Sequence, residues 1–185
     1  MLPIFRAALA ILTLSLALFG CDQKPSPSAG PKAPTGSPPK AVVGVSLLTL
    51  ANPFFVEMAE AMKAQGAASG IEVVVVSGEL DAAKQAGQVD DFLTRKVDAI
   101  ILCPVDSKAI GSAVKKANAA GTPVFTADIA VLDATAKVVS HVATDNFLGG
   151  KLAGEAMLRL LGGSGKVAII DHPEVESVIL RTRGF

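Results

Sequence analysis

The sequence contains no tryptophan or tyrosine and only two cysteines, and its charges cancel. Lys plus Arg number 17 and Asp plus Glu number 17 among 185 residues, so no basic excess is available to bind the phosphates of a nucleic acid. Cys21 and Cys103 are too few for a disulfide framework, and no residues show the spacing of metal ligands. These absences argue against a nucleic-acid-binding domain and exclude a disulfide scaffold and a zinc module.

The first 20 residues have the pattern of a secretion signal. Arg6 is followed by an apolar run over residues 7–19. This run is shorter than the roughly 20 residues that a membrane-spanning helix needs, but it fits the apolar region of a signal peptide. The residues Leu18-Phe19-Gly20-Cys21 resemble a bacterial lipobox, so we expect cleavage after residue 20 and a lipid on Cys21. An ordinary signal peptide with an incidental cysteine is the alternative.

The segment that follows, residues 21–40, is rich in Pro, Ser, Gly and Lys and has no large apolar residue. Such a composition cannot bury a core, and its prolines hold the chain extended. We expect a tether that separates a folded domain, beginning at residue 41, from a membrane surface.

From residue 41 onward, short β-branched runs alternate with amphipathic helical patterns. The strands are expected at residues 41–48, 71–76, 97–103, 123–126 and 166–171. Their hydrophobicity is continuous rather than alternating, which predicts a parallel sheet covered on both faces. Helix starts and stops are indicated at Asn52, Asp81 and Asp106 and at Gly70, Gly121 and Gly162. The pattern predicts an α/β fold with a doubly wound parallel sheet.

Polar and aromatic residues follow the predicted strands at the edge where such sheets bind ligands. Asn52, Phe54 and Phe55 come after the first strand, and Asp128 comes after the fourth. Aromatic faces pack against the C–H groups of a sugar ring, while carboxylate and amide groups pair with its hydroxyls. This set of side chains therefore suits a monosaccharide.

Plainer roles are also expected at this edge. Asn52 should cap a helix whatever else it does. Phe54 and Phe55 point about 100° apart on a helix, so at least one should leave the core. We interpret Asp106 as a helix cap and Cys103 as a small buried apolar residue.

Several segments, taken in order, resemble one known family. LLTLANPFFVEMAEAMKAQ, VDAIILCPVDSKAIGSAVKKANAAGTPVFTADIA, VVSHVATDNFLGGKLAGEAM and the terminal SVILRTRGF are similar to the type I periplasmic sugar-binding proteins of the ribose-binding kind. The resemblance implies two α/β lobes. Residues 41–142 would be a nearly complete N-terminal lobe and residues 143–185 the beginning of a C-terminal lobe, so the sequence is expected to be truncated.

The resemblance also implies a site. The family's first-lobe ligand residues match Asn52, Phe54, Phe55 and Asp128, and Arg181 matches a second-lobe arginine that donates to sugar hydroxyls. Ribose binders carry Arg and Asn where this chain has Ile129 and Cys103, so the sugar need not be ribose.

The function implied is that of an extracytoplasmic solute-binding lipoprotein. It would lie in the periplasm or cell envelope, bind a monosaccharide between its lobes without a cofactor, and deliver it to the inner-membrane permease of an ABC importer. A lipid-anchored sensor that presents a sugar or furanosyl signal to a receptor or chemoreceptor is the alternative. An enzyme is not expected, because no nucleophile or acid is placed by motif beside His141 or His172.

Overall fold

A computed structural model of the chain describes residues 40–185. The signal peptide expected over residues 1–20, the lipidated Cys21 and all but the last residue of the expected tether lie outside the described residues. The described part begins one residue before the first predicted strand.

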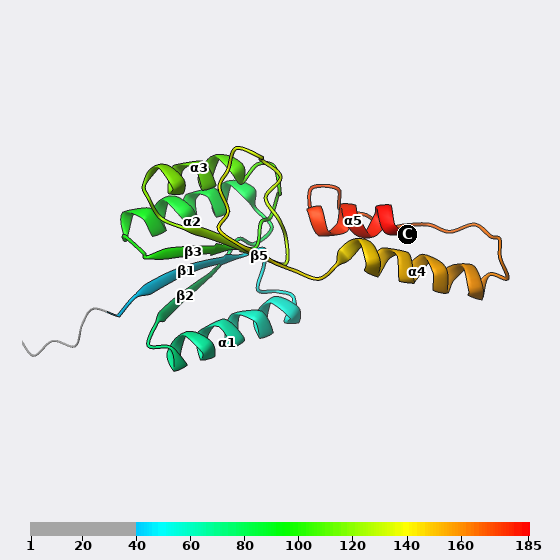
Figure 1. Cartoon of the computed structure of the whole chain (residues 1–185), viewed down its shortest axis with the longest axis horizontal. Helices are drawn as coiled ribbons and strands as arrows, with labels where there is room; N and C mark the ends of the chain where they lie inside the picture. The colour runs from blue at the N-terminus through cyan, green and yellow to red at the C-terminus, as the bar shows by residue number, and fades with distance from the viewer. Residues whose placement is uncertain (1–39) are drawn as a thin grey trace, which may run out of the picture. The chain divides into compact units, whose positions relative to one another are not determined.

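Five parallel strands form one sheet in the order β2-β1-β3-β4-β5. The strands are β1 (Val42–Leu47), β2 (Glu72–Ser77), β3 (Ala99–Leu102), β4 (Val124–Ala127) and β5 (His141–Val142). The helices are α1 (Pro53–Ala68), α2 (Ala82–Thr94), α3 (Gly111–Ala119), α4 (Asn146–Leu160) and α5 (Glu176–Gly184), and Figure 1 shows their arrangement. The predicted parallel α/β fold is confirmed.

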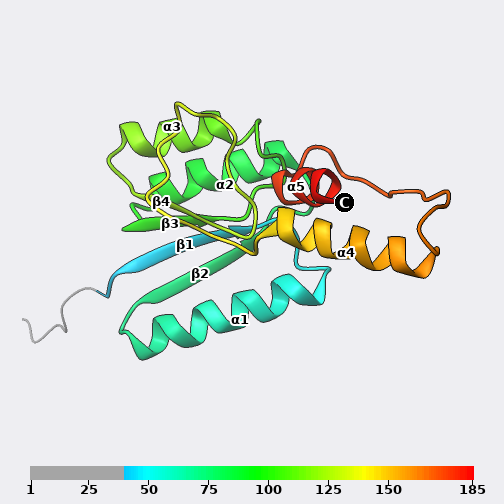
Figure 2. The same ribbon diagram turned by 45° about the vertical axis from the view of Figure 1, so that its right-hand side comes forward.

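The two faces of the sheet carry separate apolar clusters. Helices α2 and α3 lie on one face and α1 lies on the other, as Figures 1 and 2 show. Successive strand residues point to opposite faces, so Ile100 packs in the cluster under α2 and α3 while its neighbour Ile101 packs toward α1. This arrangement explains why the strand sequences are apolar throughout.

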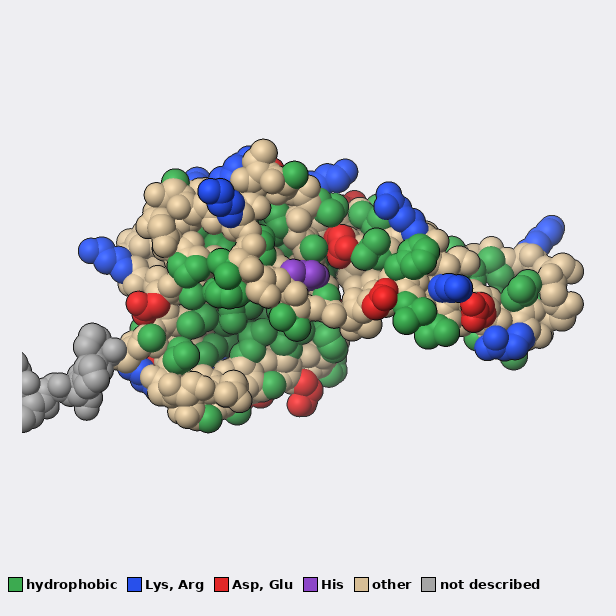
Figure 3. Space-filling model, viewed as in Figure 1, with side chains coloured by type: hydrophobic (Ala, Val, Ile, Leu, Met, Phe, Trp, Pro, Cys, Tyr) green, Lys and Arg blue, Asp and Glu red, His purple; other side chains and the backbone are tan. Residues whose placement is uncertain are grey.

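The face that carries α1 is only partly covered within residues 40–185. An apolar groove of about 590 Å³ runs beside α1, between Met58 and Met62 of that helix and Ile101, Phe125 and Val142 of the sheet. Figure 3 shows hydrophobic side chains gathered in a hollow on this side of the molecule. Within the described residues, the expectation that both faces are covered is therefore met only in part at β3 and is wrong at β4, because a single helix on this face cannot span five strands.

The expected signals mark the starts of α1 and α2 and the ends of α1, α3 and α4. Asn52 and Asp81 each accept hydrogen bonds from first-turn amides of α1 and α2. Gly70, Gly121 and Gly162 follow helices with φ of 72°, 76° and 68°, a conformation that glycine adopts without steric cost. None of the helices within residues 40–185 has both the length and the apolar character needed to cross a bilayer.

Two details differ from expectation. Residues 166–171, predicted as a strand, are irregular, and Ile170 is fully exposed. A strand requires a neighbour to pair its backbone N–H and C=O groups, and no described strand lies beside this segment. The short β5 was not predicted, and it is held by the bond from the Asp128 amide to the Val142 carbonyl, 2.8 Å. The division into lobes near residue 142 stays a prediction.

Candidate functional site

The five residues predicted to bind a sugar line one cavity of about 310 Å³. They come from three separate segments, namely the start of α1, the residue after β4, and α5. The complete lining consists of Leu48, Asn52, Phe54, Phe55, Asp128, Ile129, His172, Val175, Ser177, Val178 and Arg181. The prediction that residues following different strands lie together at one edge of the sheet is therefore confirmed for Asn52, Phe54 and Asp128.

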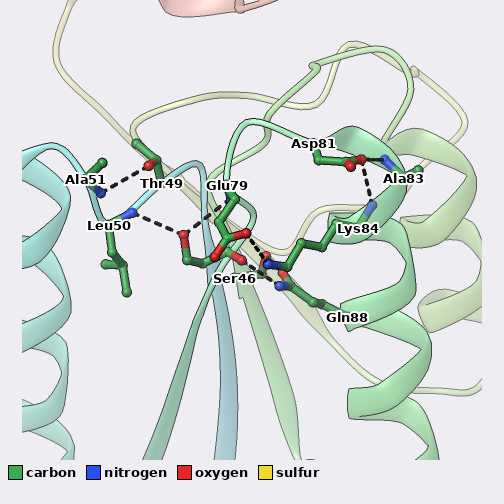
Figure 4. Close-up of polar contacts among 10 residues, drawn as sticks. Ser46, Thr49, Leu50, Ala51, Glu79, Asp81, Ala83, Lys84 and Gln88 are labelled. Atoms are coloured by element: carbon green, nitrogen blue, oxygen red, sulfur yellow. Dashed lines mark hydrogen bonds and ion pairs between the residues drawn. The ribbon is translucent and has the colours of Figure 1, made fainter.

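The loop between β1 and α1 is fixed by polar contacts that the sequence did not reveal. The Leu50 amide donates to Ser77 Oγ at 3.2 Å, and the Ala51 amide donates to Thr49 Oγ1 at 3.1 Å. Figure 4 shows these contacts beside the start of α2. At the end of this loop, Asn52 Oδ1 accepts from the Phe54 amide at 3.0 Å. The cap uses the oxygen of the Asn52 side chain, and its NH₂ group has no hydrogen-bond partner among the described residues.

Of the two adjacent phenylalanines, Phe54 leaves the core and Phe55 is buried in it, in agreement with the expectation that at least one ring leaves the core. Their rings meet edge to face, with centroids 5.1 Å apart. Phe54 is 52% exposed, whereas Phe55 is 5% exposed and belongs to the apolar cluster under α1. Both rings reach the cavity lining, but Phe54 presents the larger free surface.

Asp128 occupies a strained turn at the end of β4. Its φ is 65°, which is uncommon for a residue with a side chain, and the Ile129 amide donates to the Ala127 carbonyl at 2.7 Å across it. Burial raises the pKa of the Asp128 carboxyl, while electrostatic interactions with Arg181 and His141 oppose that rise. The turn holds a half-buried carboxylate on the cavity wall.

Arg181 reaches the cavity from α5, which packs closely on α4. Glycine at position 150 permits this approach, because a Cβ there would collide with the backbone of Arg181. The two helices lie side by side in Figures 1 and 2. Arg181 lines the same cavity as Asp128, and the fork of donors of its guanidinium is suited to paired oxygen atoms.

The cavity includes residues that sequence reasoning did not assign. Ser177 and Val178 precede Arg181 by about one helical turn, so the helical period could have indicated them. His172 lies on the irregular segment before α5, where no pattern indicates its direction; its Nε2 is 3.4 Å from the Glu174 carboxylate. These residues add one hydroxyl and one imidazole to the polar groups of the cavity.

Cys103 has the plainer role expected of it, whereas the prediction that Asp106 caps a helix is wrong, because α3 begins at Gly111 after Ile110 without a side-chain cap bond. Cys103 is fully buried, and burial raises the pKa of its thiol to about 12. Its Sγ lies 3.9 Å from Asp128 Oδ2. Asp106 Oδ1 accepts from the Lys108 and Ala109 amides, each at 2.8 Å, in the turn that precedes α3.

The chemistry available in the cavity is that of hydrogen bonding to a neutral, hydroxyl-rich molecule. The carboxylate accepts, the guanidinium and the amide NH₂ donate, and the apolar walls pack against C–H groups. No group of three or more His, Cys, Asp or Glu side chains within residues 40–185 is arranged to hold a metal ion.

Comparison with known proteins places this geometry in context. The sequence profile of the periplasmic binding protein domain matches residues 43–185. The ribose import binding protein of Bacillus subtilis is 37% identical over 182 residues, covering 97% of this chain and 59% of that protein. The D-apiose import binding protein of Paraburkholderia graminis is 36% identical over 135 residues, covering 72% of this chain and 43% of that protein.

A solved structure gives the same match in three dimensions. An ABC transporter solute binding protein from Bacillus halodurans, with bound myo-inositol, superposes with a TM-score of 0.73 at 33% identity, covering 81% of this chain and 52% of that one. The chain thus spans between two fifths and three fifths of the length of these proteins.

Proposed function

This chain belongs to the periplasmic binding protein domain family, and we propose that it binds a neutral monosaccharide in the cavity lined by Asn52, Phe54, Phe55, Asp128 and Arg181. The observation that carries the proposal is the convergence of these side chains from three segments onto one cavity. Relatives named for the import of ribose and of D-apiose, and a structural neighbour with bound myo-inositol, support a polyhydroxylated ligand.

Each side chain has a distinct task in the proposed complex. The exposed ring of Phe54 stacks on the apolar face of the sugar. The Asp128 carboxylate accepts hydrogen bonds from two hydroxyls, and Arg181 donates to other oxygen atoms of the sugar. No bond is made or broken, so the chain acts as a binding protein rather than as an enzyme.

Binding is proposed to favour the arrangement in which α5 lies against the edge of the sheet. Arg181 belongs to α5, whereas Asn52 and Asp128 belong to the sheet edge. A sugar that contacts both sides gains free energy only when both are close, so it shifts the population toward the closed arrangement. Two neighbours of Asp128, Ile129 and Cys103, have apolar side chains and do not indicate a particular sugar. The identity of the sugar therefore has to be found by a screen.

The proposed setting is the bacterial cell envelope. We propose that the mature protein is anchored through lipid on Cys21, held off the membrane by the residues up to 40, and passes its sugar to an ABC-type permease. Labelling with radioactive palmitate should mark the wild-type chain and not Cys21→Ser. Loss of uptake of the bound sugar in a deletion strain would support transport, while intact uptake with lost chemotaxis or gene induction would support the sensor role.

A thermal-shift screen of pentoses, hexoses and polyols tests the sugar site. At least one of these should raise the melting temperature of the purified protein. At the same sugar concentration the matched variant Asp128→Asn should show a much smaller rise, while Asp133→Asn, outside the cavity, should respond as the wild type does. A full set of sugars without effect on the wild type would contradict the proposal.

A further inference from the structure

Helix α5 begins without a cap of its own. The residue before it, Val175, has an aliphatic side chain and makes no side-chain cap bond. Helices leave their first amides unpaired, and a Ser, Thr, Asp or Asn at this position normally accepts from one of them. In this chain the Glu176 amide donates instead to Ser107 Oγ at 3.0 Å, from a residue 69 positions earlier. The cap of α5 is therefore supplied by the loop that follows β3.

Ser107 is held in place independently of α5. It is fully buried, and its carbonyl accepts from the Leu132 amide at 2.7 Å. The preceding Asp106 shapes the turn by capping the two amides that follow Ser107. The hydroxyl is thus presented by a turn that is bonded to the segment after β4, which makes it a fixed acceptor for the helix.

A second hydrogen bond joins the same two segments. The Ser107 amide donates to the Glu174 carbonyl at 3.0 Å, so one serine contacts the residues on both sides of Val175. Val175 itself is 2% exposed and packs in the apolar cluster with Phe55 and Ile129. This contact is the place where the start of α5 is fastened to the sheet.

The contact with Ser107 lies at the start of the helix that carries Arg181. Val175, Ser177 and Val178 line the cavity together with Arg181, so a shift of the first turn of α5 would move one wall of the site. We propose that Ser107 is a positioning residue, a latch that caps α5 from the sheet side and thereby holds Arg181 toward Asp128. The expected effect of this latch on sugar binding rests on the proposed function, because Ser107 itself does not line the cavity.

Both latch bonds exist only while α5 lies against the loop after β3. They stabilise the same arrangement that a sugar bridging Asp128 and Arg181 would favour. The latch should therefore slow sugar release, because release requires that α5 move away. It should leave the encounter rate unchanged, because Ser107 makes no contact with the entering ligand.

The first test needs no ligand. Amide hydrogen exchange is measured at single-residue resolution in the wild type and in Ser107→Ala, with Ser112→Ala as the matched control, because Ser112 Oγ bonds only within its own turn. Loss of a bond of about 1–1.5 kcal/mol predicts roughly tenfold faster exchange at Glu176 in Ser107→Ala. Amides of β1 and the Ser112→Ala protein should be unchanged. Unaltered exchange at Glu176 would overturn the proposal.

The second test measures release of sugar. For whichever of D-ribose, D-apiose and myo-inositol binds the wild type most tightly, Ser107→Ala should raise the dissociation rate roughly five- to tenfold, with the association rate unchanged. Ser107→Thr, which keeps the hydroxyl, should restore slow release. Equal dissociation rates for wild type and Ser107→Ala would overturn the latch.

The two tests separate the two proposals. If neither these three sugars nor any other compound of the thermal-shift screen binds the wild type, the sugar site is wrong, and the exchange of Glu176 alone then decides whether Ser107 holds α5. Should Ser107→Ala fail to fold, Ser107→Cys supplies a weaker acceptor of similar size. It should give an intermediate exchange rate at Glu176, and a wild-type rate would overturn the proposal.

Discussion

Asp128 and Arg181 line one cavity from two separate segments, Asp128 from a strained turn after β4 and Arg181 from α5. Their charges interact, since Arg181 lowers the pKa of Asp128 against the larger rise caused by burial. A carboxylate kept in a partly desolvated position at a cost to stability is typical of a group retained for binding.

Replacing Asp128 should therefore separate stability from affinity. Because burial disfavours its charged form, Asp128→Asn should raise the melting temperature of the sugar-free protein at neutral pH. Loss of hydrogen bonds to a charged acceptor, about 1.5–3 kcal/mol, should weaken sugar binding roughly 10- to 100-fold. Calorimetric titration and thermal unfolding of the same samples measure both effects. A destabilised variant with unaltered affinity would show that the carboxylate is structural.

The raised pKa of Asp128 also predicts how the protein responds to acid. Sugar binding needs the ionised carboxylate, so affinity should fall on acidification at a higher pH than for an ordinary aspartate. For stability the sign is opposite: a raised folded-state pKa contributes stability at low pH that is lost as pH rises through it. Titrations between pH 4 and 8 should show this loss of affinity in the wild type and a flat profile in Asp128→Asn. A wild-type profile that stays flat would count against Asp128 as an acceptor.

The two adjacent phenylalanines should behave differently when truncated. Phe54→Ala removes an exposed stacking surface and should weaken sugar binding by about 1 kcal/mol, or roughly fivefold, with little change in stability. Phe55→Ala opens a cavity in the apolar cluster and should lower the free energy of unfolding by about 3–5 kcal/mol. Urea unfolding and calorimetric titration distinguish the two outcomes. The reverse pattern would mean that Phe55 is the ligand-facing ring.

The contact between α4 and α5 should be sensitive to one methyl group. In Gly150→Ala the new Cβ meets the backbone of Arg181, which should cost about 1–3 kcal/mol of stability and displace the guanidinium. Gly149→Ala places its Cβ in open space and should be neutral or stabilising by about 0.5–1 kcal/mol. Unfolding and sugar affinity are measured for both. Equal behaviour of the two variants would show that α5 does not need this close approach.

Cys103 should be chemically inert in the folded protein. Burial raises its pKa to about 12, so almost no thiolate exists at pH 8. Maleimide labelling followed by peptide mapping should find Cys103 unmodified in the native protein and fully modified in denaturant. Rapid native labelling would mean that the cavity opens down to the end of β3.

Much of the fold could be predicted from local signals in the sequence. Continuous β-branched runs, the Asn52 cap and glycines such as Gly121 depend on backbone sterics and near-neighbour bonds, which the residues themselves specify. The segment over 166–171 shows the limit of this reasoning, because strand propensity produces a strand only where a neighbour pairs with it. The brief β5 was missed for the converse reason: its two residues have no pattern, and their pairing depends on the Asp128 turn.

The candidate site likewise contains some residues that could be predicted from the sequence and others that could not. Residues that follow strands, such as Asn52 and Asp128, could be placed because parallel strands share an edge. His172 and the cap from Ser107 to Glu176 could not, because contacts between residues so far apart in sequence depend on how α5 packs. The open groove beside Met58 was also beyond prediction, since apolar strands do not show which helix covers them.

The position of a bound sugar tests the central proposal most directly. A crystal structure of the protein with the sugar that most raises its melting temperature should show hydroxyls within about 3 Å of the Asp128 carboxylate and the Arg181 guanidinium, with the ring against Phe54. A sugar found instead in the apolar groove beside Met58 and Met62, or bound without contact to Asp128 and Arg181, would contradict it.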